Sequence, residues 1–214
     1  MSDPLFSKKN LKLLTTPLSD SNPITVQVLG ICSALAVTAQ LKPAIVMTLS
    51  VMAVLALANV IISLLRNTIP TRIRIIVQLV VVAALVILVD QVLRAYVYDV
   101  SKQLSVFVGL IITNCILMGR LEAFALGNRP WQSFLDGIGN AAGYGIILII
   151  VAVIREILGS GSLMGYKLIP DSWYIVNGGF YSNNGLMVLS PMALIVVGII
   201  IWVQRRCSRK LIEN

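Results

Sequence analysis

Two cysteines carry the clearest chemical signal in the chain, because each lies near the middle of a short apolar stretch that opens one half of the protein. Cys32 lies in residues 26–37 and Cys115 in residues 108–119. Each stretch is too short or too polar for a comfortable membrane span. A pair of interrupted apolar segments at corresponding positions in two halves indicates a midplane binding site in inverted-repeat membrane proteins. Because thiolates bind metals, the pair predicts a metal site inside the bilayer.

Two thiolates are too few to complete such a site. Iron–sulfur centres and tetrahedral iron or zinc sites take four ligands, and the chain has no histidine to supply the rest. The missing two ligands must therefore come from another chain, either a second copy or a similar partner. A shared centre in mid-membrane would suit electron transfer across the bilayer. In the alternative interpretation, Cys32 and Cys115 are small apolar residues with no chemical role.

Acidic residues in or beside apolar spans form a second group of candidates, because such residues are functional by default. Asp90 and Asp136 are candidate contacts for a hard cation such as Na⁺, which prefers oxygen ligands, and Glu122 is a third possibility. The alternative is an ion pair, since Asp90 has an arginine one helical turn away. Glu156 directly follows an arginine, and for it we favour the structural interpretation. No nucleotide-binding motif or catalytic triad is present.

Membrane helices must position these residues. The 214 residues are 57% hydrophobic and 12% charged, and a soluble domain carries about twice that share of charge. We predict an all-α integral membrane protein in which the first and fourth spans are discontinuous. The six predicted spans are 24–41, 43–65, 73–93, 104–119, 134–158 and 187–204.

The distribution of basic residues predicts the orientation of these spans. An even number of spans places both ends of the chain on one side, and most of the 17 lysines and arginines fall on that side. The other side holds only Lys42, Arg94, Lys102, Arg155 and Lys167. By the positive-inside rule, the N-terminal segment 1–22 and the tail 205–214 are cytoplasmic.

The single membrane domain divides into two halves, residues 24–93 and 104–204, which an odd number of spans per half places in opposite orientations. Cys32 lies on the order of 12 Å from one face, and Cys115 on the order of 16 Å from the other. Both therefore arrive near the midplane. Residues 136–145 carry glycine and alanine at three- and four-residue spacing, which favours close packing of another helix.

Five blocks resemble a known family. They are residues 29–37, 89–96, 107–125, 136–140 and 155–161. With them, almost the whole chain resembles the family of D subunits of the bacterial Na⁺-translocating NADH:quinone reductases. These membrane proteins are related to subunits of the Rnf-type complexes.

The resemblance implies one of six subunits in a bacterial inner-membrane translocase that passes electrons from NADH to ubiquinone. It implies a partner, the homologous six-helix E subunit, with opposite topology. Each of the two would supply two cysteines, here Cys32 and Cys115, to one iron centre, either 2Fe–2S or a single iron. It also implies that Asp90 and Asp136 act in Na⁺ movement. Flavins and NADH would lie on other subunits, and no residue of this chain is expected to be catalytic alone.

We therefore expect an electron-relay subunit of a redox-driven sodium pump. Three alternatives stay open. The first is a subunit of an Rnf-type ferredoxin:NAD⁺ complex. The second is a non-redox inverted-repeat transporter, which would act as a single chain and tolerate loss of both cysteines. The third is a scaffold for redox partners, which would leave electron transfer normal without the thiols.

Overall fold

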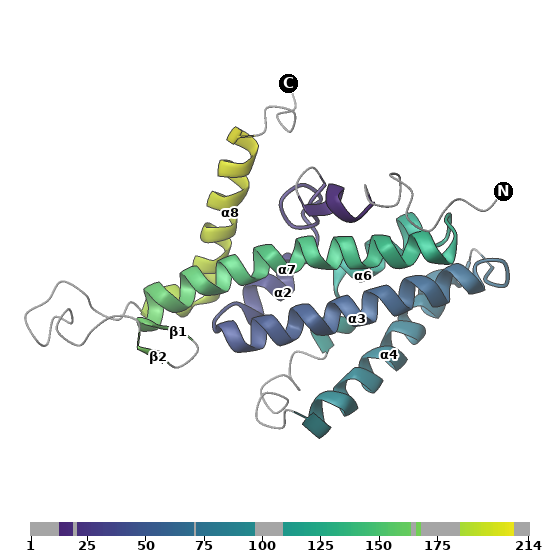
Figure 1. The fold of residues 1–214 in the computed structure, drawn as a ribbon, viewed down its shortest axis with the longest axis horizontal. Coiled ribbons are helices and arrows are strands. Elements are labelled where there is room, and N and C mark those ends of the chain that lie inside the picture. Colours follow the sequence, from purple (N-terminus) through teal and green to yellow (C-terminus); the bar gives the residue numbers. More distant parts are fainter. Residues whose placement is uncertain are drawn as a thin grey trace, which may run out of the picture.

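A computed structural model describes residues 13–18, 21–70, 72–96, 109–163, 166–167 and 185–207 (Figure 1). In this part the regular secondary structure is helical, apart from a short antiparallel pair of two-residue strands. The long helices are α3 (Leu41–Leu65), α4 (Arg74–Tyr96), α7 (Pro130–Ser160) and α8 (Ser190–Cys207). The shorter elements are η1 (Thr16–Leu18), α2 (Ile31–Val37), α6 (Cys115–Arg120), the π-helix η2 (Leu121–Ala125), β1 (Ser162–Leu163), β2 (Tyr166–Lys167) and η5 (Gly185–Val188).

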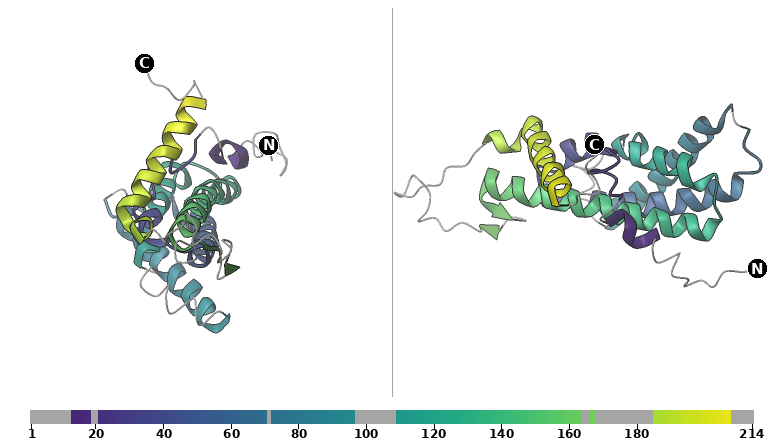
Figure 2. Two further views of the ribbon diagram at one scale, coloured as in Figure 1. Left: turned by 90° about the vertical axis from the view of Figure 1, so that its left-hand side faces the viewer. Right: turned by 90° about the horizontal axis from the view of Figure 1, so that it is seen from above.

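Helices α3 and α7 lie side by side and form the centre of the molecule (Figures 1 and 2). Their contact depends on small residues. A Cβ added to Gly137 of α7 would lie 3.0 Å from the Cα of Ala56 in α3. Asn59 of α3 donates a hydrogen bond across the interface to the backbone carbonyl of Ser133, at 2.9 Å. The predicted close packing of residues 136–145 is confirmed for Gly137 and Gly145, which face α3, whereas Gly139 and Gly143 face the backbone of residues 13, 14 and 17.

Three helices are long and apolar enough to cross a membrane, namely Leu41–Leu65, Arg74–Ala95 and Pro130–Ser160. They coincide with the predicted spans 43–65, 73–93 and 134–158. At 1.5 Å per residue, each exceeds the roughly 30 Å of a hydrocarbon core. The prediction of an all-α membrane protein is confirmed at this level, whereas six spans and the inverted repeat stay predictions.

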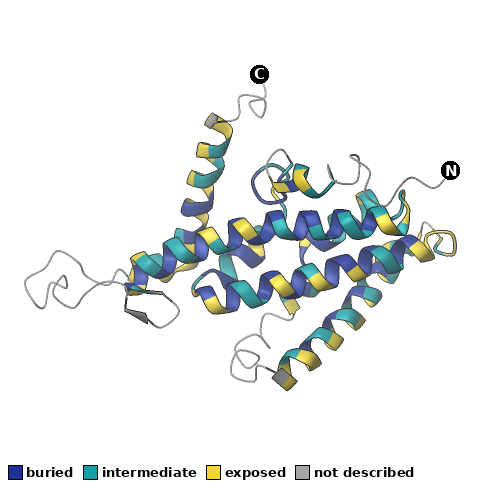
Figure 3. Ribbon diagram, viewed as in Figure 1, coloured by how far each residue is buried: buried dark blue, intermediate teal, exposed yellow. Residues whose placement is uncertain are grey.

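Helices α4 and α8 are exposed over much of their length (Figure 3), and many of their exposed residues are large and apolar. The two helices diverge from opposite ends of the α3–α7 pair (Figure 1). The exposed residues on α4 include Ile75, Ile76, Val80, Ile87, Leu88 and Val92, and those on α8 include Leu194, Ile195, Ile199, Trp202 and Val203. Continuous apolar surface of this extent is typical of membrane and subunit contacts.

Helix is interrupted near both cysteines. Within the predicted span 24–41, helix α2 covers only Ile31–Val37, which rises about 10 Å. In the other half, the helix that includes residues 109–112 breaks at Thr113 and Asn114, and α6 then begins at Cys115. Residues 104–108 of the predicted fourth span lie outside the described residues. These breaks are the places where side chains must supply the hydrogen bonds that helix geometry no longer provides.

Candidate functional site

Both cysteines lie in the first turn of a short helix, and both are free and exposed. Cys32 is the second residue of α2, and Cys115 is the first residue of α6. The described part of the chain contains no group of three or more His, Cys, Asp or Glu side chains that could hold a metal ion. The described residues therefore offer two accessible thiols at these helix breaks, and a four-ligand centre there would need ligands beyond them.

A buried hydrogen-bonded junction joins the two cysteine segments. The side-chain amide of Asn114, the residue before Cys115, donates to the hydroxyl oxygen of Ser33, the residue after Cys32, at 3.2 Å. The same Ser33 oxygen lies 2.7 Å from the hydroxyl of Tyr144 on α7. The fold thus places the two predicted ligand segments next to each other, although the residues joined are 81 positions apart in sequence.

Gly30 allows the close approach at this junction. It precedes α2 with φ of +78°, a left-handed conformation that favours glycine. A Cβ at this position would lie 2.9 Å from Cε2 of Tyr144. Backbone conformation and space therefore both require glycine here.

The break between α2 and α3 is held by two consecutive residues of α7. Arg155 donates to the hydroxyl of Thr38, just after α2, at 2.6 Å. It also donates to the backbone carbonyls of residues 187, 188 and 189, just before α8. The Glu156 carboxylate accepts a hydrogen bond from the backbone N–H of Leu41, the first residue of α3, at 2.6 Å. The structural interpretation of Glu156 therefore has a specific form, because this carboxylate caps the N-terminal end of α3.

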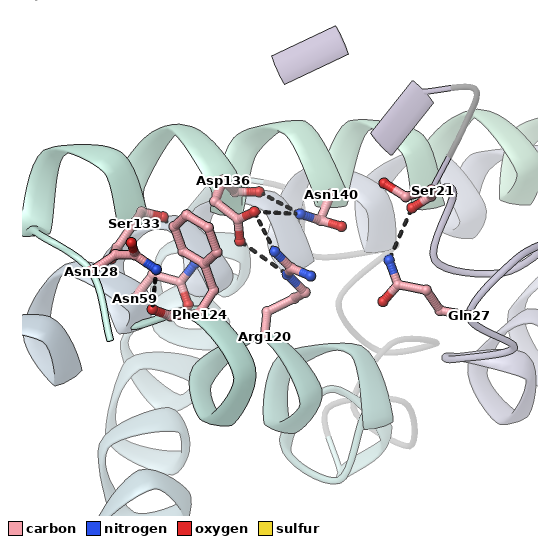
Figure 4. Close-up of polar contacts among 9 residues, drawn as sticks. All are labelled: Ser21, Gln27, Asn59, Arg120, Phe124, Asn128, Ser133, Asp136 and Asn140. Carbon is pink, nitrogen blue, oxygen red and sulfur yellow. Dashed lines mark hydrogen bonds and ion pairs between the residues drawn. The ribbon is translucent and has the colours of Figure 1, made fainter. Parts of the chain in front are cut away.

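Asp136 is buried and ion-paired (Figure 4). Arg120 of α6 donates to both carboxylate oxygens, with Nε lying 3.0 Å from Oδ2. Asn140, one turn further along α7, donates to Oδ1 at 3.0 Å. Arg120 also lies over the ring of Phe124, 5.4 Å from its centroid. The negative charge is therefore balanced within the protein.

A cavity of about 300 Å³ adjoins this ion pair. It is lined by Leu13, Thr16, Pro17, Ser21, Arg120, Phe124, Asp136 and Asn140. The Oδ1 atom of Asn140 is buried and has no hydrogen-bond partner among the described residues. A small polar guest such as water would satisfy it.

The other two acidic candidates also have basic partners. Asp90 accepts from Arg94, its neighbour one turn along α4, at 2.9 Å. Glu122 pairs with Arg74 and accepts a hydrogen bond from Gln78 at 3.2 Å. The alternative of an ion pair, which the sequence left open for Asp90, thus matches the geometry, and the Na⁺ role of Asp90 and Asp136 stays a prediction.

Sequence reasoning missed the junction residues Ser33 and Tyr144. Asn114, the third residue of the junction, counted only among the polar residues that make the stretch 108–119 a poor membrane span. A polar residue directly beside a cysteine in both halves was the available signal, but it does not reveal the partner on α7.

The long apolar helices pack against one another through glycines, and free thiols lie where helices are interrupted. These features define an integral membrane protein with discontinuous helices. A family model described as "Rnf-Nqr subunit, membrane protein" matches residues 10–201. The chain belongs to this family.

Curated relatives are similar over nearly the whole chain. A protein of Aeromonas hydrophila subsp. hydrophila is 59% identical over 202 residues, covering 94% of this chain and 95% of the relative. A protein of Photobacterium profundum is 57% identical over 199 residues, 93% of each chain. A protein of Haemophilus ducreyi is 56% identical over 210 residues, covering 98% and 100%. Each of the three is named as the D subunit of a Na(+)-translocating NADH-quinone reductase.

Proposed function

We propose that this chain is the D subunit of a Na⁺-translocating NADH:quinone reductase, a redox-driven sodium pump. The observation that carries the proposal is identity of 59% across nearly the full length of a relative with that name. In this role the chain relays electrons through the membrane part of a six-subunit complex, on their way from NADH to ubiquinone. The nucleotide and the flavins lie on other subunits.

In the proposed relay, Cys32 and Cys115 hold one side of an iron centre. The donor set fits, because both thiols are free and exposed and their segments are joined by the Asn114–Ser33 hydrogen bond. A homologous E subunit would supply two further cysteines, completing four thiolates around a 2Fe–2S cluster or a single iron. When bound, the centre supplies one-electron transfer. This chain's part is to keep two thiols together at a protein surface that a partner covers.

The architecture proposed with this function has six spans in two inverted halves, with both termini on the cytoplasmic side of the bacterial inner membrane. The long apolar helices support the membrane setting. The short helices α2 and α6, which begin beside helix breaks in the two predicted halves, support the proposed repeat.

Asp136 and Asp90 are proposed to contact Na⁺ during transport. Each carboxylate is paired with an arginine in this structure, so a cation reaching either oxygen must compete with the guanidinium. This arrangement suits a transient contact better than a permanent site, because the ion pair reforms when the cation leaves. The cavity beside Asp136 gives a small ion access to it.

The nearest alternative is a subunit of an Rnf-type ferredoxin:NAD⁺ complex, because the matching family includes both kinds of complex in its description. The names of the similar proteins favour the quinone reductase. A stand-alone transporter without redox chemistry is less well supported, because it gives no role to two exposed thiols whose segments are joined by a hydrogen bond.

Gene deletion and complementation test the proposed function. Membrane vesicles from a bacterium lacking the corresponding gene should lose Na⁺-stimulated NADH:quinone reductase activity and regain it with this chain. Cys32→Ser should fail to restore activity, whereas the control Cys207→Ser, in the predicted cytoplasmic tail region, should restore it. Full activity with Cys32→Ser would remove the relay role, and restoration of only ferredoxin-linked activity would favour the Rnf alternative.

A further inference from the structure

We propose that Tyr144 is a positioning residue for the thiol pair, acting through the hydroxyl of Ser33 and the side chain of Asn114. This inference deepens the proposed function and depends on it. The three side chains form a junction that fixes the cysteine segments of the two halves relative to each other and to helix α7.

Three hydrogen bonds meet at the Ser33 hydroxyl. The Ser33 hydroxyl donates to the backbone carbonyl of Gly30 at 2.8 Å. When the proton lies on this carbonyl, the Ser33 oxygen accepts from Tyr144 across their 2.7 Å contact, in which either oxygen can be the donor. The amide of Asn114 donates to the same oxygen at 3.2 Å. Ser33 thus donates one hydrogen bond and accepts two, which uses the full capacity of its hydroxyl.

The junction is sealed from its surroundings. Tyr144 is 0% exposed, Ser33 2% and Asn114 4%. A buried polar group that loses its partner keeps its desolvation penalty, so breaking one bond of such a network is costly. The hydrogen bonds among the three side chains therefore stabilise one relative position of α2, α6 and α7.

The three junction residues lie on the two cysteine segments and on the long helix α7. Ser33 lies in α2, one residue after Cys32. Asn114 immediately precedes Cys115, and its Oδ1 accepts the backbone N–H of Ile116, so it also caps α6. Tyr144 lies within the long helix α7, which packs along α3. Rotation of α2 or α6 would strain the junction, and the junction in turn limits where the two thiols point.

Hydrogen-bonded groups behind metal ligands commonly set ligand orientation and tune the bound metal. Neither Ser33 nor Tyr144 needs to touch iron for this effect. Removing the tyrosine hydroxyl leaves Ser33 with one acceptor position empty and frees α2 to shift. Removal of the Tyr144 hydroxyl from α7 is therefore predicted to alter the positions of both cysteine thiols.

The test compares Tyr144→Phe with the control Thr48→Val in the purified complex. Thr48 is buried on α3 beside α7, and its hydroxyl donates only to the carbonyl of Ala44 in its own helix. The readouts are iron content, the midpoint potential and absorption spectrum of the iron centre, and alkylation rates of Cys32 and Cys115 after iron removal.

For Tyr144→Phe we expect iron to be retained but the potential and spectrum to change. A tenfold change in the reduction equilibrium corresponds to ~59 mV for a one-electron couple, and we expect a shift of up to about that size. In the iron-free complex both thiols should react about two to ten times faster, as loss of one ordinary buried hydrogen bond allows. Thr48→Val should change none of these. Unchanged potential, spectrum and alkylation in Tyr144→Phe would overturn the proposal.

If the Tyr144→Phe complex does not assemble, Asn114→Ser is a second variant that tests the same junction. Serine still caps α6 but does not reach Ser33, so the same changes are expected with the helix cap preserved. If Asn114→Ser leaves every readout at the native value, the positioning role is excluded. Failure of the proposed function is seen separately, because Cys32→Ser would then leave the iron content of the complex unchanged.

Discussion

At the scale of single residues, the charge on Asp136 is the feature that most needs explanation. A carboxylate that is 2% exposed within a membrane helix is unfavourable unless it is paired. Arg120 and Asn140 supply the pairing through three hydrogen bonds. Substitution of Asp136 therefore has two consequences. It removes the proposed Na⁺ contact, and it leaves the charge of Arg120 without a counter-charge. An experiment must separate the two.

We expect Asp136→Ala to weaken Na⁺ stimulation of turnover and to destabilise the subunit, because removing one partner of a buried ion pair costs about 3–5 kcal/mol. The double variant Arg120→Met with Asp136→Leu removes both charges and should recover assembly without recovering Na⁺ stimulation. Steady-state turnover against Na⁺ concentration, with assembly checked by native gel, makes the comparison. Recovery of Na⁺ stimulation in the double variant would show that the carboxylate has only a structural role.

Gly30 is the second residue whose identity the structure explains. We expect Gly30→Ala to destabilise the protein by about 1–2 kcal/mol from its left-handed backbone conformation alone, with a further loss from contact with Tyr144. Gly109→Ala is the matched control, since nothing lies within 4 Å of a Cβ added there. Thermal unfolding in detergent measures both. Equal melting temperatures for the two variants would contradict the assigned role of Gly30.

At the scale of elements, α7 organises the site. It packs along α3, pairs Asp136 with α6, holds Ser33 of α2 through Tyr144, and caps the α2–α3 break through Arg155 and Glu156. One rigid helix therefore positions both short cysteine helices. The arrangement explains how interrupted helices that are individually too short to be stable keep a fixed geometry.

Close packing between α7 and α3 is itself testable. We expect Gly137→Ala to lower stability by about 1–3 kcal/mol, because the added methyl group would lie 3.0 Å from the backbone of Ala56 and neither helix can yield cheaply. Gly198→Ala in α8, where an added Cβ has no neighbour within 4 Å, should have little effect. Thermal unfolding of the two variants in the same detergent compares them. A stable Gly137→Ala variant would mean that the α3–α7 contact is looser than described.

Hydropathy predicted the long helices but not the side-chain hydrogen bonds that connect one helix to another. The predicted spans 43–65, 73–93 and 134–158 agree with α3, α4 and α7, because runs of apolar residues set the length of a buried helix. The interruptions near Cys32 and Cys115 were also visible as polar residues within apolar stretches. The Tyr144–Ser33 and Arg120–Asp136 contacts were not, since hydrogen bonds between distant segments leave no period in the sequence.

At the scale of the whole molecule, α4 and α8 expose apolar residues and the two thiols are exposed as well (Figure 3). Such a surface is expected to contact lipid or other subunits. Lipid is sufficient to cover an aliphatic helix face, but it offers no partner to a thiol ligand. The partner subunit that we propose, with two more thiolates, would account for the exposed cysteines.

Topology gives a prediction at this scale. Fluorescent-protein fusions to either end of the chain should both fluoresce in the cytoplasm, because the six proposed spans and the distribution of basic residues would place both termini there. Periplasmic reporter fusions at the same ends should be inactive. Opposite reporter results at the two ends would indicate an odd number of spans and would remove the inverted-repeat arrangement.

The measurement that tests the central claim most directly is the iron and acid-labile sulfide content of the purified native complex and of its Cys32→Ser variant. Loss of about two irons and two sulfides per complex is the result expected for a shared 2Fe–2S centre with four thiolate ligands, and loss of iron without sulfide would indicate a single-iron site. Unchanged iron and sulfide in a fully assembled Cys32→Ser complex would contradict the account and make Cys32 an ordinary small residue.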